Sequence, residues 1–438
     1  MFSEFTQGGG IYFVGIGGVS MSALALLLHA EGVPVRGSDL KESEYTEKLR
    51  AAGIRVHIGE SEPISESTIV YTGAVTKGQS QIARAKGAQL IPRSVFLGRV
   101  AREFSHTVSV AGCHGKTTTT SMLSHIFREN GRKFACHIGG EDLDLSNCFS
   151  SGGEYFVTEA CEFQRSFLAL RSEVGIVLNI ERDHTDCYAD EREIFEAYAA
   201  FARRCRSVVV NEDDARARTI PHALSFGLYG GDIRAERLRA EGERYSFTVT
   251  ERSLPLVRVK LNAVGKVHLY NALASFAAAR LLGFSAEEIR LGLESFRGVK
   301  RRFERVGTFQ GTPVVCDYAH HPSEMRATLR AAQNMTAGGV HLVFQPHTYT
   351  RTRDLMEDFV AVLQEAETPI VYQTFAAREP FEFAGSAVAL CSKVPEAVYA
   401  QSPEQLRARL KELAAGKDDM ILVLGAGDIY DIAKSILD

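Results

Sequence analysis

The sequence predicts an α/β protein of three domains, each built around a parallel sheet. Three segments of the chain each combine apolar runs of strand length with turns and helical stretches, and this alternation favours parallel strands joined by helical crossovers. The length of 438 residues fits two to four domains, at roughly 100–200 residues each. With 45% hydrophobic and 24% charged residues, the chain can bury a large core without disulfides or a metal ion.

Charge and cysteine content exclude several classes of protein. The formal net charge is −4, so no basic excess indicates a nucleic acid or an anionic membrane as partner. The eight cysteines include no C-x-x-C pair, which is typical of free thiols in a reducing cytoplasm. Residues 5–30 carry no charge and resemble a membrane span, but glycines interrupt them. We therefore predict a buried strand, a turn and a buried helix there.

The first segment, residues 1–102, begins with a strand, a glycine turn and a helix. Residues 11–15 form a short apolar run, the next glycines predict a turn, and residues 21–29 have the apolar spacing of a helix. A second strand ends near Asp39, about 20 residues after the turn, where an acid is typical of nucleotide-binding sheets. We expect a Rossmann-like domain.

The second segment, residues 103–298, carries the most informative motif of the chain. A predicted buried strand is followed by the loop Gly112-Cys113-His114-Gly115-Lys116-Thr117-Thr118 and then by a helix. The glycines let backbone N–H groups point at phosphate oxygens, and the helix N-terminus adds a positive dipole. Lys116 would neutralise the phosphates of ATP, and the Thr117 hydroxyl would bind Mg²⁺. We predict a central P-loop ATPase domain with a parallel sheet, although Val110 replaces the first glycine of the common spacing.

Two further polar residues follow predicted strands of the same segment. Glu159 ends the apolar run before it, and His184 follows the run at residues 174–179. Because ligand sites in parallel sheets form at the carboxyl ends of strands, both side chains could face the phosphate loop. There they could hold a second Mg²⁺ or orient water. From the residues alone, a helix-capping Glu159 and a hydrogen-bonded loop His184 stay open as alternatives.

The third segment, residues 299–438, follows Gly298 and a short basic run. Strands are predicted at residues 314–317, 340–344 and 420–424. Helical stretches follow Pro322, Thr352 and Asp428. We expect a second Rossmann-like domain at the C-terminal end.

Motifs in all three segments resemble those of the Mur ligase family. They follow one another in family order from residue 13 to residue 428, so chance is a poor explanation. The matching segments are residues 15–22, 37–39, 112–120, 159–162, 179–184, 301–303, 317–322, 345–352 and 425–428.

The resemblance implies a cytoplasmic ligase of bacterial peptidoglycan synthesis that uses ATP to form an amide bond. Within the family, the residues are most similar to those of ligases that join L-alanine to the lactyl carboxylate of UDP-N-acetylmuramate. ATP would first phosphorylate this carboxylate, and the amine would then attack the acyl phosphate. The expected partners are these two small molecules with Mg²⁺ and ATP, and the expected assembly is a monomer or a homodimer. We expect neither nucleic acid nor membrane insertion.

The resemblance also implies roles for individual residues. Catalysis would depend on Lys116, Glu159 and His184, and the metal would be held by Thr117, Glu159 and His184. ATP would be bound by Gly112, Cys113, His114, Gly115, Lys116, Thr117, Thr118, Asn271, Arg302 and Asp317. The UDP-sugar would be bound by Gly15, Gly17, Gly18, Ser20, Met21, Ser38 and Asp39. The amino acid would be bound by Tyr318, His320, His347 and Arg351, the last through a bidentate pair with its carboxylate.

At several positions the sequence departs from the family pattern. In the adenine motif G-x-H-N-x-x-N, Val267 and His268 replace the histidine and the first asparagine, whereas Asn271 is kept. Thr348 replaces an arginine, which leaves Arg351 as the main cation for the amino-acid carboxylate. The phosphate contacts are therefore better defined by the sequence than the adenine contacts.

Three other functions stay open on the sequence. A related recycling ligase would add a preformed peptide to the same sugar. A noncatalytic cell-wall protein would bind ATP without substrate-dependent release of ADP. A nicotinamide-dependent dehydrogenase would use the first glycine turn and Asp39, but it leaves the phosphate loop unexplained. L-Alanine is not ranked against glycine or L-serine, because one methyl or hydroxyl group changes binding by only about 1–3 kcal/mol.

Overall fold

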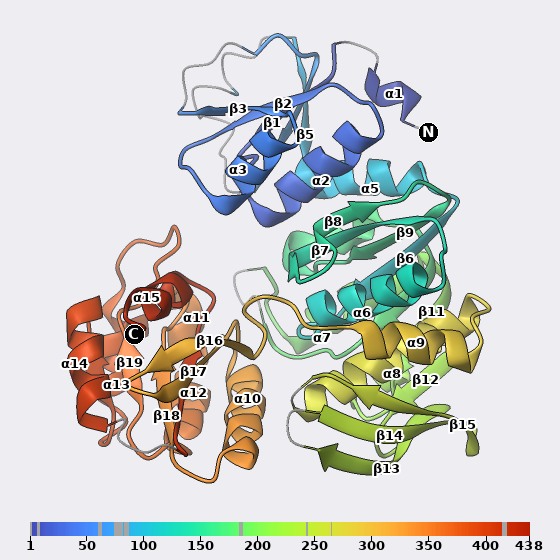
Figure 1. Ribbon diagram of the computed structural model, residues 1–438. Helices are drawn as coiled ribbons and strands as arrows, with labels where there is room; N and C mark the ends of the chain where they lie inside the picture. The colour runs from blue at the N-terminus through green and yellow to red at the C-terminus, as the bar shows by residue number, and fades with distance from the viewer. Residues whose placement is uncertain are drawn as a thin grey trace.

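The computed structural model describes residues 2–6, 9–59, 64–73, 82, 87–183, 187–241, 244–263, 265–413 and 418–438. The strands form three separate sheets, one in each segment of the chain that the sequence predicts to be a domain (Figure 1). The three-domain α/β architecture is therefore confirmed. Boundaries after residues 102 and 298 are our proposal for dividing the chain among the three domains.

The N-terminal sheet has five parallel strands in the order β3-β2-β1-β4-β5. They are β1 (Ile11–Val14), β2 (Val35–Asp39), β3 (Arg55–Ile58), β4 (Thr68–Tyr71) and β5 (Gln89–Pro92). The helices are α1 (Ser3–Thr6), α2 (Val19–Ala30), α3 (Glu44–Ala51) and α5 (Arg93–Arg102). The uncharged stretch forms the buried β1 and α2, as predicted. In the part of the chain that the structure describes, no helix combines the length and apolar character needed to cross a membrane.

The central sheet has ten strands in the order β15-β14-β13-β12-β11-β10-β6-β9-β7-β8. They are β6 (His106–Ala111), β7 (Phe134–Asp142), β8 (Ser146–Ser150), β9 (Tyr155–Glu159), β10 (Ser172–Val177), β11 (Cys205–Asn211), β12 (Leu224–Gly227), β13 (Ile233–Glu241), β14 (Arg244–Glu251) and β15 (Leu254–Leu261). The helices are α6 (Lys116–Glu129), η1 (Phe163–Ala169), α7 (Glu191–Ala202), η2 (Ala217–Thr219), α8 (Lys266–Leu281) and α9 (Ala286–Ser295). The six neighbouring strands β12, β11, β10, β6, β9 and β7 all run parallel to one another.

Parallel pairing does not extend through every sheet, which corrects the prediction of parallel sheets throughout. At the edges of the central sheet, β13, β14 and β15 pair antiparallel, and so do β7 and β8. A two-residue turn forces the strands that it joins to run antiparallel, because a parallel crossover usually needs a dozen or more residues. Strands β12 and β13, which are joined by residues 228–232, nevertheless pair parallel. The turn between β14 and β15 consists of Arg252 and Ser253, with φ of +48° and +69°. It lacks the glycine or asparagine that usually marks such a turn.

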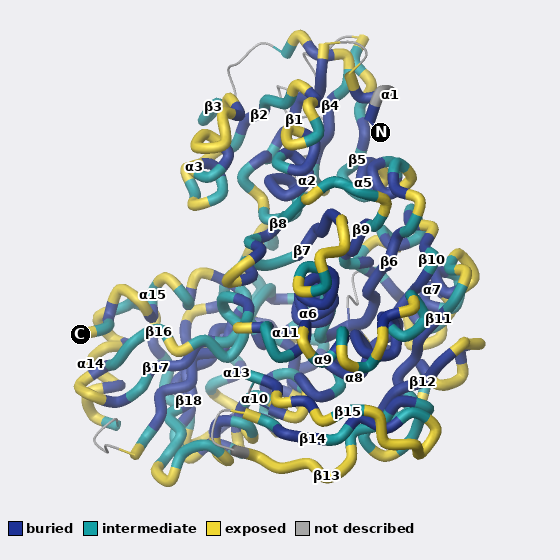
Figure 2. Tube along the Cα trace, turned by 45° about the vertical axis from the view of Figure 1, so that its right-hand side comes forward, coloured by how far each residue is buried: buried dark blue, intermediate teal, exposed yellow. Residues whose placement is uncertain are grey.

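Apolar cores lie on both faces of the central sheet. Leu123, Phe276 and Leu293 from α6, α8 and α9 share one buried core. Most of α6 is coloured as buried in Figure 2. A second core is continuous between the central and N-terminal domains. Within it, the ring centroid of Phe104 lies 4.9 Å from that of Phe156 in the central domain and 5.7 Å from that of Phe2 in the N-terminal domain. The N-terminal domain is therefore held to the central domain by buried apolar side chains.

The C-terminal sheet has six strands in the order β16-β17-β21-β18-β19-β20, parallel except for β16. They are β16 (Glu304–Phe309), β17 (Thr312–Asp317), β18 (Val340–Phe344), β19 (Ile370–Tyr372), β20 (Val398–Ala400) and β21 (Met420–Leu424). The helices are α10 (Pro322–Met335), α11 (Tyr349–Asp354), α12 (Met356–Leu363), η3 (Phe383–Gly385), α13 (Ala387–Cys391), α14 (Pro403–Leu413) and α15 (Ile429–Ser435). The three predicted strands are confirmed. Helix α10 contacts α8 of the central domain (Figure 1).

Candidate active site

The phosphate loop lies at the carboxyl end of β6, between this strand and α6. Gly112 and Gly115 have φ of +151° and +85°. A Cβ atom at Gly115 would lie only 2.5 Å from Oδ1 of Asn271. Asn179 holds the loop backbone, since its Oδ1 accepts from the N–H of His114 at 2.8 Å and its Nδ2 donates to the carbonyl of His114 at 3.1 Å. Backbone N–H groups and a helix N-terminus therefore meet in one anion-binding loop.

Lys116, the first residue of α6, turns its ammonium group back into the loop. Nζ donates to the carbonyl oxygen of Gly112 at 2.5 Å and to the two carboxylate oxygens of Glu162 at 2.8 and 3.0 Å. Burial alone would lower the pKa of Lys116, but the Glu162 carboxylate outweighs burial and raises this pKa. The lysine is charged, and Glu162 is its counter-charge.

Glu159 ends β9, the strand next to β6, and lies against β7. Its Oε1 accepts from the backbone N–H of Gly139 at 2.6 Å. A Cβ atom at Gly139 would lie 2.5 Å from the Glu159 carboxylate, and one at Gly140 would lie 2.9 Å from Cγ2 of Thr117. Two consecutive glycines thus make room for the side chains of Glu159 and Thr117. These side chains carry a carboxylate and a hydroxyl, which are oxygen donors of the type that Mg²⁺ prefers. His184, the third predicted metal ligand, lies outside the described residues.

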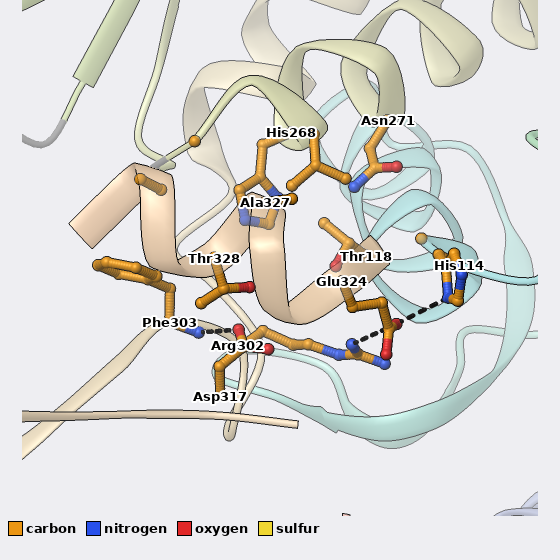
Figure 3. A pocket seen from close by; sticks show the side chains of 14 residues that line it. His114, Thr118, His268, Asn271, Arg302, Phe303, Asp317, Glu324, Ala327 and Thr328 are labelled. Atoms are coloured by element: carbon orange, nitrogen blue, oxygen red, sulfur yellow. Dashed lines mark hydrogen bonds and ion pairs between the residues drawn. The ribbon is translucent and has the colours of Figure 1, made fainter. Parts of the chain in front are cut away.

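A pocket of about 60 Å³ lies between the phosphate loop, α8 and α10 (Figure 3). Helix α10 closes it from the C-terminal domain with residues that include Glu324 and Thr328. The structure thus brings together predicted ATP-binding residues from three distant parts of the chain. Those that line the pocket are His114, Gly115, Thr118, Asn271, Arg302 and Asp317.

Asp317 and the basic residues before β16 form the C-terminal side of this pocket. The carboxylate of Asp317 accepts from the backbone N–H groups of Phe303 and Ala319, both at 2.7 Å. Burial raises the pKa of Asp317 to about 6. The guanidinium groups of Arg301 and Arg302 lie 4.9 and 5.1 Å from the ring centroid of Tyr318. Tyr318 is therefore positioned by cation–π contacts between the ATP pocket and the residues predicted to bind the amino acid.

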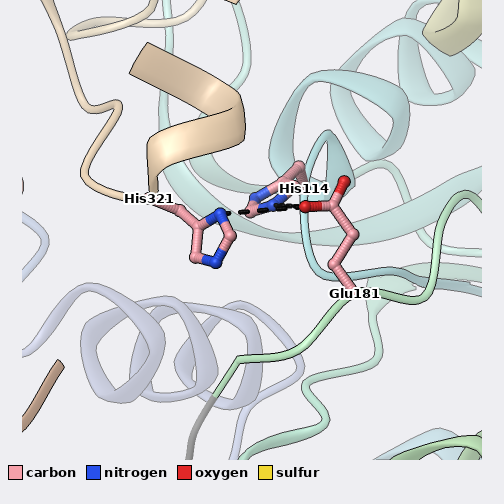
Figure 4. Close-up of side chains that lie close together, drawn as sticks. All are labelled: His114, Glu181 and His321. Carbon is pink, nitrogen blue, oxygen red and sulfur yellow. Dashed lines mark hydrogen bonds and ion pairs between the residues drawn. The ribbon is translucent and has the colours of Figure 1, made fainter. Parts of the chain in front are cut away.

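A polar cluster joins the phosphate loop to the first turn of α10 (Figure 4). Nδ1 of His114 lies 3.0 Å from Oε1 of Glu324, and Nε2 of His114 lies 3.4 Å from Oε2 of Glu181. His321, the residue before α10, has its Nδ1 3.7 Å from the same Glu181 oxygen. Burial alone would lower the pKa of His114, but the two carboxylates outweigh burial and raise this pKa to about 10. His114 is therefore charged at neutral pH.

The residues predicted to bind the amino acid lie together in the C-terminal domain. The ring centroids of His320 and Tyr318 are 5.3 Å apart, and those of His320 and His347 are 5.8 Å apart. Nη1 of Arg351 lies 3.4 Å from Nδ1 of His347. Burial lowers the pKa of His320 to about 3 and, together with the charge of Arg351, that of His347 to about 4. Both imidazoles are neutral at neutral pH.

Arg351 forms an ion pair with the central domain. Its Nη2 and Nε lie 3.1 and 3.3 Å from Oδ1 of Asp183, and both side chains are mostly buried. A guanidinium group has five N–H donors, so Arg351 can bind a second carboxylate beside Asp183. The pair links the residues predicted to bind the amino acid to the segment of the central domain that precedes His184.

The glycine turn of the N-terminal domain faces the central domain across a cavity of about 340 Å³. Gly18, Ser20 and Met21 line this cavity together with Glu159. The other residues predicted to bind the UDP-sugar do not line the cavity, since Gly15 and Gly17 lie in the turn itself and Ser38 and Asp39 lie at the end of β2. The carboxylate of Asp39 accepts a hydrogen bond from the backbone N–H of Gly17 at 2.8 Å. The carbonyl oxygen of Ser38 accepts one from the backbone N–H of Gly15 at 2.8 Å.

Ser20 connects the two domains at this cavity. Its Oγ lies 2.7 Å from Nε2 of His137 on β7 and accepts from Nη1 of Arg93 at 3.0 Å. Burial and the charge of Arg93 lower the pKa of His137 to about 3, so this imidazole is neutral. The cavity that contains Glu159 is thus bounded by side chains of both domains.

Comparison with known proteins identifies the family of the chain. The model described as "Mur ligase family, catalytic domain" matches residues 10–105, "Mur ligase middle domain" matches residues 110–279, and "Mur ligase, glutamate ligase domain" matches residues 301–427. The chain belongs to the Mur ligase family.

Similar proteins cover this Mur ligase over its whole length. A UDP-N-acetylmuramate–L-alanine ligase of Clostridium novyi is 36% identical over 446 residues, which cover 98% of this chain and 97% of the relative. The enzyme of the same name from Caldicellulosiruptor bescii is 37% identical and covers 97% and 98%. The crystal structure of the UDP-N-acetylmuramate-alanine ligase from Thermotoga maritima superposes with a TM-score of 0.84 at 26% identity, over 97% of both chains. A murein peptide ligase from Psychrobacter arcticus shares the fold, with a TM-score of 0.73 at 23% identity.

Several residues of this Mur ligase site are not evident from the sequence. Glu162 lies within a matching segment, yet nothing in the sequence pairs it with Lys116. His137 and Arg93 give no signal, because Ser20, which both contact, is distant from each of them in the sequence. Glu324 could have been found, since an acid four residues after His320 at the start of a helix lies on the same helical face.

Proposed function

We propose that this Mur ligase joins L-alanine to the lactyl carboxylate of UDP-N-acetylmuramate, with conversion of ATP to ADP and phosphate, in peptidoglycan precursor synthesis. One observation carries the proposal, the convergence of residues from all three domains on the ends of β6 and β9. The full-length similarity to ligases of this name supports the choice of substrates. ATP and the nucleotide sugar are cytoplasmic compounds, so we infer that the reaction takes place in the cytoplasm.

In this proposal, the phosphate loop holds the phosphates of ATP. Lys116 would exchange the Glu162 carboxylate for phosphate oxygens, and the backbone N–H groups of the loop would donate to the same oxygens. Negative charge accumulates on the transferred phosphoryl group, and preorganised donors stabilise this charge without the cost of reorganising solvent. Asn271 and Arg302 would contact the rest of the nucleotide in the pocket beneath α10.

Thr117, Glu159 and His184 would hold Mg²⁺ in this proposal. The hydroxyl, the carboxylate and the space left by Gly139 and Gly140 fit this ion. When bound, Mg²⁺ would neutralise charge on the phosphates and on the acceptor carboxylate.

The acceptor would bind in the cavity between the N-terminal and central domains. Its carboxylate must come close to the γ-phosphate, and Glu159 at the edge of this cavity lies beside the phosphate loop. Arg93 is the only lysine or arginine among the described residues of the cavity wall. We propose that Arg93 contributes the positive charge that holds the anionic acceptor.

The amino acid would bind in the C-terminal domain, with its carboxylate on Arg351. Its amine must lie close to the acyl phosphate, in a site from which water is excluded. His320 and His347 are neutral and weakly basic because burial lowers both pKa values. We therefore propose that these imidazoles orient the amino acid through hydrogen bonds and do not store its proton.

The first experiment measures release of ADP and phosphate by the purified full-length protein. We expect release only when UDP-N-acetylmuramate, L-alanine, ATP and Mg²⁺ are all present. Lys116→Ala should lower kcat at least about a hundredfold, since it removes the main cation of the phosphate site. Lys393→Ala is the matched control, because this exposed lysine pairs only with Glu357 among the described contacts.

Each alternative predicts a different result in this assay. Turnover with a preformed peptide but not with L-alanine would identify a recycling ligase. ATP binding without substrate-dependent ADP release would indicate a noncatalytic protein. Undiminished turnover by Lys116→Ala would reject the assignment of the phosphate site.

A further inference from the structure

Glu324, in the first turn of α10, contacts groups that belong to two different proposed substrate sites. Figure 3 shows its contacts with His114 and Arg302 at the pocket beneath α10. Its Oε1 lies 3.0 Å from Nδ1 of His114 and 3.8 Å from Nη1 of Arg302. Its Oε2 accepts from the backbone N–H of His320 at 3.1 Å and lies 3.4 Å from Nδ1 of the same residue. One carboxylate therefore contacts the phosphate loop, the basic run before β16 and the amino-acid pocket.

The surroundings keep this carboxylate charged although its side chain is only 11% exposed. Burial alone would raise the pKa of Glu324, but the charge and hydrogen bond of His114 and the charge of Arg302 outweigh burial and hold the pKa well below its usual range. His114 is charged in turn, so the two form a mostly buried ion pair between the domains. Breaking such a pair by removing one partner leaves the other charge buried and uncompensated.

Other contacts of the first turn of α10 fix the position of Glu324. Ser323 Oγ donates to Oε2 of Glu181 at 2.7 Å, and Nε2 of His321 lies 3.2 Å from the carbonyl oxygen of Arg182. Burial would raise the pKa of Glu181, but the hydrogen bond and charge of His114 outweigh it and hold the pKa at about 2. Together with the Glu324–His114 pair, these two contacts tie the start of α10 to the central domain beside the phosphate loop.

A metal ion is not needed to explain the cluster. His114, Glu181 and His321 each place a ligand atom within 4.8 Å of the others (Figure 4). However, Ser323 Oγ lies 3.1 Å from Nε2 of His114, 2.7 Å from Oε2 of Glu181 and 2.8 Å from Nδ1 of His321. Hydrogen bonds through the serine hydroxyl already account for the arrangement.

We propose that Glu324 is a positioning residue of the ligation reaction, which couples the phosphate loop to the amino-acid pocket when the C-terminal domain docks. The inference rests on the proposed function. By pairing with His114 and with the backbone of His320, Glu324 brings the amino acid to the phosphate loop in a defined position. Glu324 acts through these two residues and not on the reacting atoms, so its loss should affect the use of the amino acid more than that of the acceptor.

The test compares Glu324→Gln with Glu365→Gln in the full-length protein. Glu365 also pairs with α10, through Arg326 and Arg330, but its side chain is 30% exposed. For Glu324→Gln we expect kcat to fall about tenfold or more and KM for L-alanine to rise at least about threefold. KM for UDP-N-acetylmuramate should change less than about twofold. Glu365→Gln should match the unsubstituted protein in every parameter.

The pH profile separates positioning from a loss of stability. His114 is faced by Glu324 and His321 from α10 and by Glu181 from the segment after β10. With its pKa raised to about 10, His114 stays charged through neutral pH. Glu324→Gln removes one of the two carboxylates, so the pKa of His114 falls and its charge is lost as pH rises. The activity deficit of Glu324→Gln should therefore be larger at about pH 9 than at about pH 6.

A measurement with an ATP analogue alone tests the role of Glu324 without relying on the ligation of L-alanine. Small-angle scattering with a nonhydrolysable ATP analogue should show a more extended particle for Glu324→Gln than for Glu365→Gln. If the unsubstituted protein does not ligate L-alanine, the proposed function fails, while scattering still tests the coupling. Equal kinetics, pH profiles and scattering for the two variants would overturn the role of Glu324. A lower melting temperature of Glu324→Gln, together with an equal loss of kcat/KM for all three substrates, would also overturn it.

Discussion

Single glycines determine how closely the backbone approaches the catalytic side chains. Gly112 and Gly115 could be assigned from the sequence, because they belong to a local motif in which the loop itself requires positive φ. Gly139 could not be assigned, although a Cβ atom there would lie 2.5 Å from the Glu159 carboxylate. Glycine is needed at position 139 because Glu159 lies against it. Glu159 ends β9, which pairs with β7 in the sheet but follows it in the chain.

Gly139→Ala should weaken the use of Mg²⁺ without unfolding the protein. The added methyl group would displace the Glu159 carboxylate, so the Mg²⁺ concentration for half-maximal activity should rise by about tenfold. A Mg²⁺ titration of the ligase rate measures this. Gly339→Ala is the control, because the nearest atom to its Cβ would lie at 3.7 Å. An unchanged Mg²⁺ requirement in Gly139→Ala would separate Glu159 from the metal.

Helix α8 shows how an element far from the phosphate loop in sequence supports the site. It carries Asn271 against Gly115, and its buried residues Leu269 and Leu273 share one core with Phe247 of β14. The helix is predictable in part from its apolar composition. The antiparallel strands beside it are not, because the Arg252-Ser253 turn contains no residue that usually marks a tight hairpin.

Phe247→Ala should destabilise the central domain and weaken ATP binding together. The ring is 1% exposed, and removing a buried phenylalanine costs about 3–5 kcal/mol. We expect a lower melting temperature and a higher KM for ATP, measured on the same preparation. Leu254→Ala, in the same hairpin but 69% exposed, should leave both values within error. Loss of stability with an unchanged KM for ATP would show that this core does not support the nucleotide site.

At the scale of the whole molecule, the proposed substrate sites lie where domains meet. Nζ of Lys48 in α3 lies 2.6 Å from Oε1 of Glu141 in the central domain, and Nζ of Lys300 lies 3.3 Å from Oε2 of Glu44. Arg351 and Asp183 join the C-terminal domain to the central domain in the same way. The proposed ATP pocket and the proposed acceptor cavity therefore depend on the relative placement of the domains.

Arg93→Ala should impair the binding of the acceptor selectively. Arg93 lines the cavity between the first two domains and holds Ser20, so its loss should raise KM for UDP-N-acetylmuramate about tenfold. KM for ATP should change less than about twofold. Steady-state kinetics with each substrate varied in turn measures both. Arg99→Ala on the same helix is the control, since its guanidinium group bonds to Gln89 outside the cavity. Equal effects on both KM values would contradict the placement of the acceptor.

The sequence by itself determined the α/β class, the three domains, the phosphate loop and most of the residues gathered around it. These features follow from local patterns, since strand and helix periodicity and turn glycines act over short stretches of chain. Only the tertiary structure decided the antiparallel edges, the Lys116–Glu162 pair, the need for Gly139 and the contact of Glu324 with His114. Each of these depends on atoms that are distant in sequence, and their distances are set by how the sheets and domains pack.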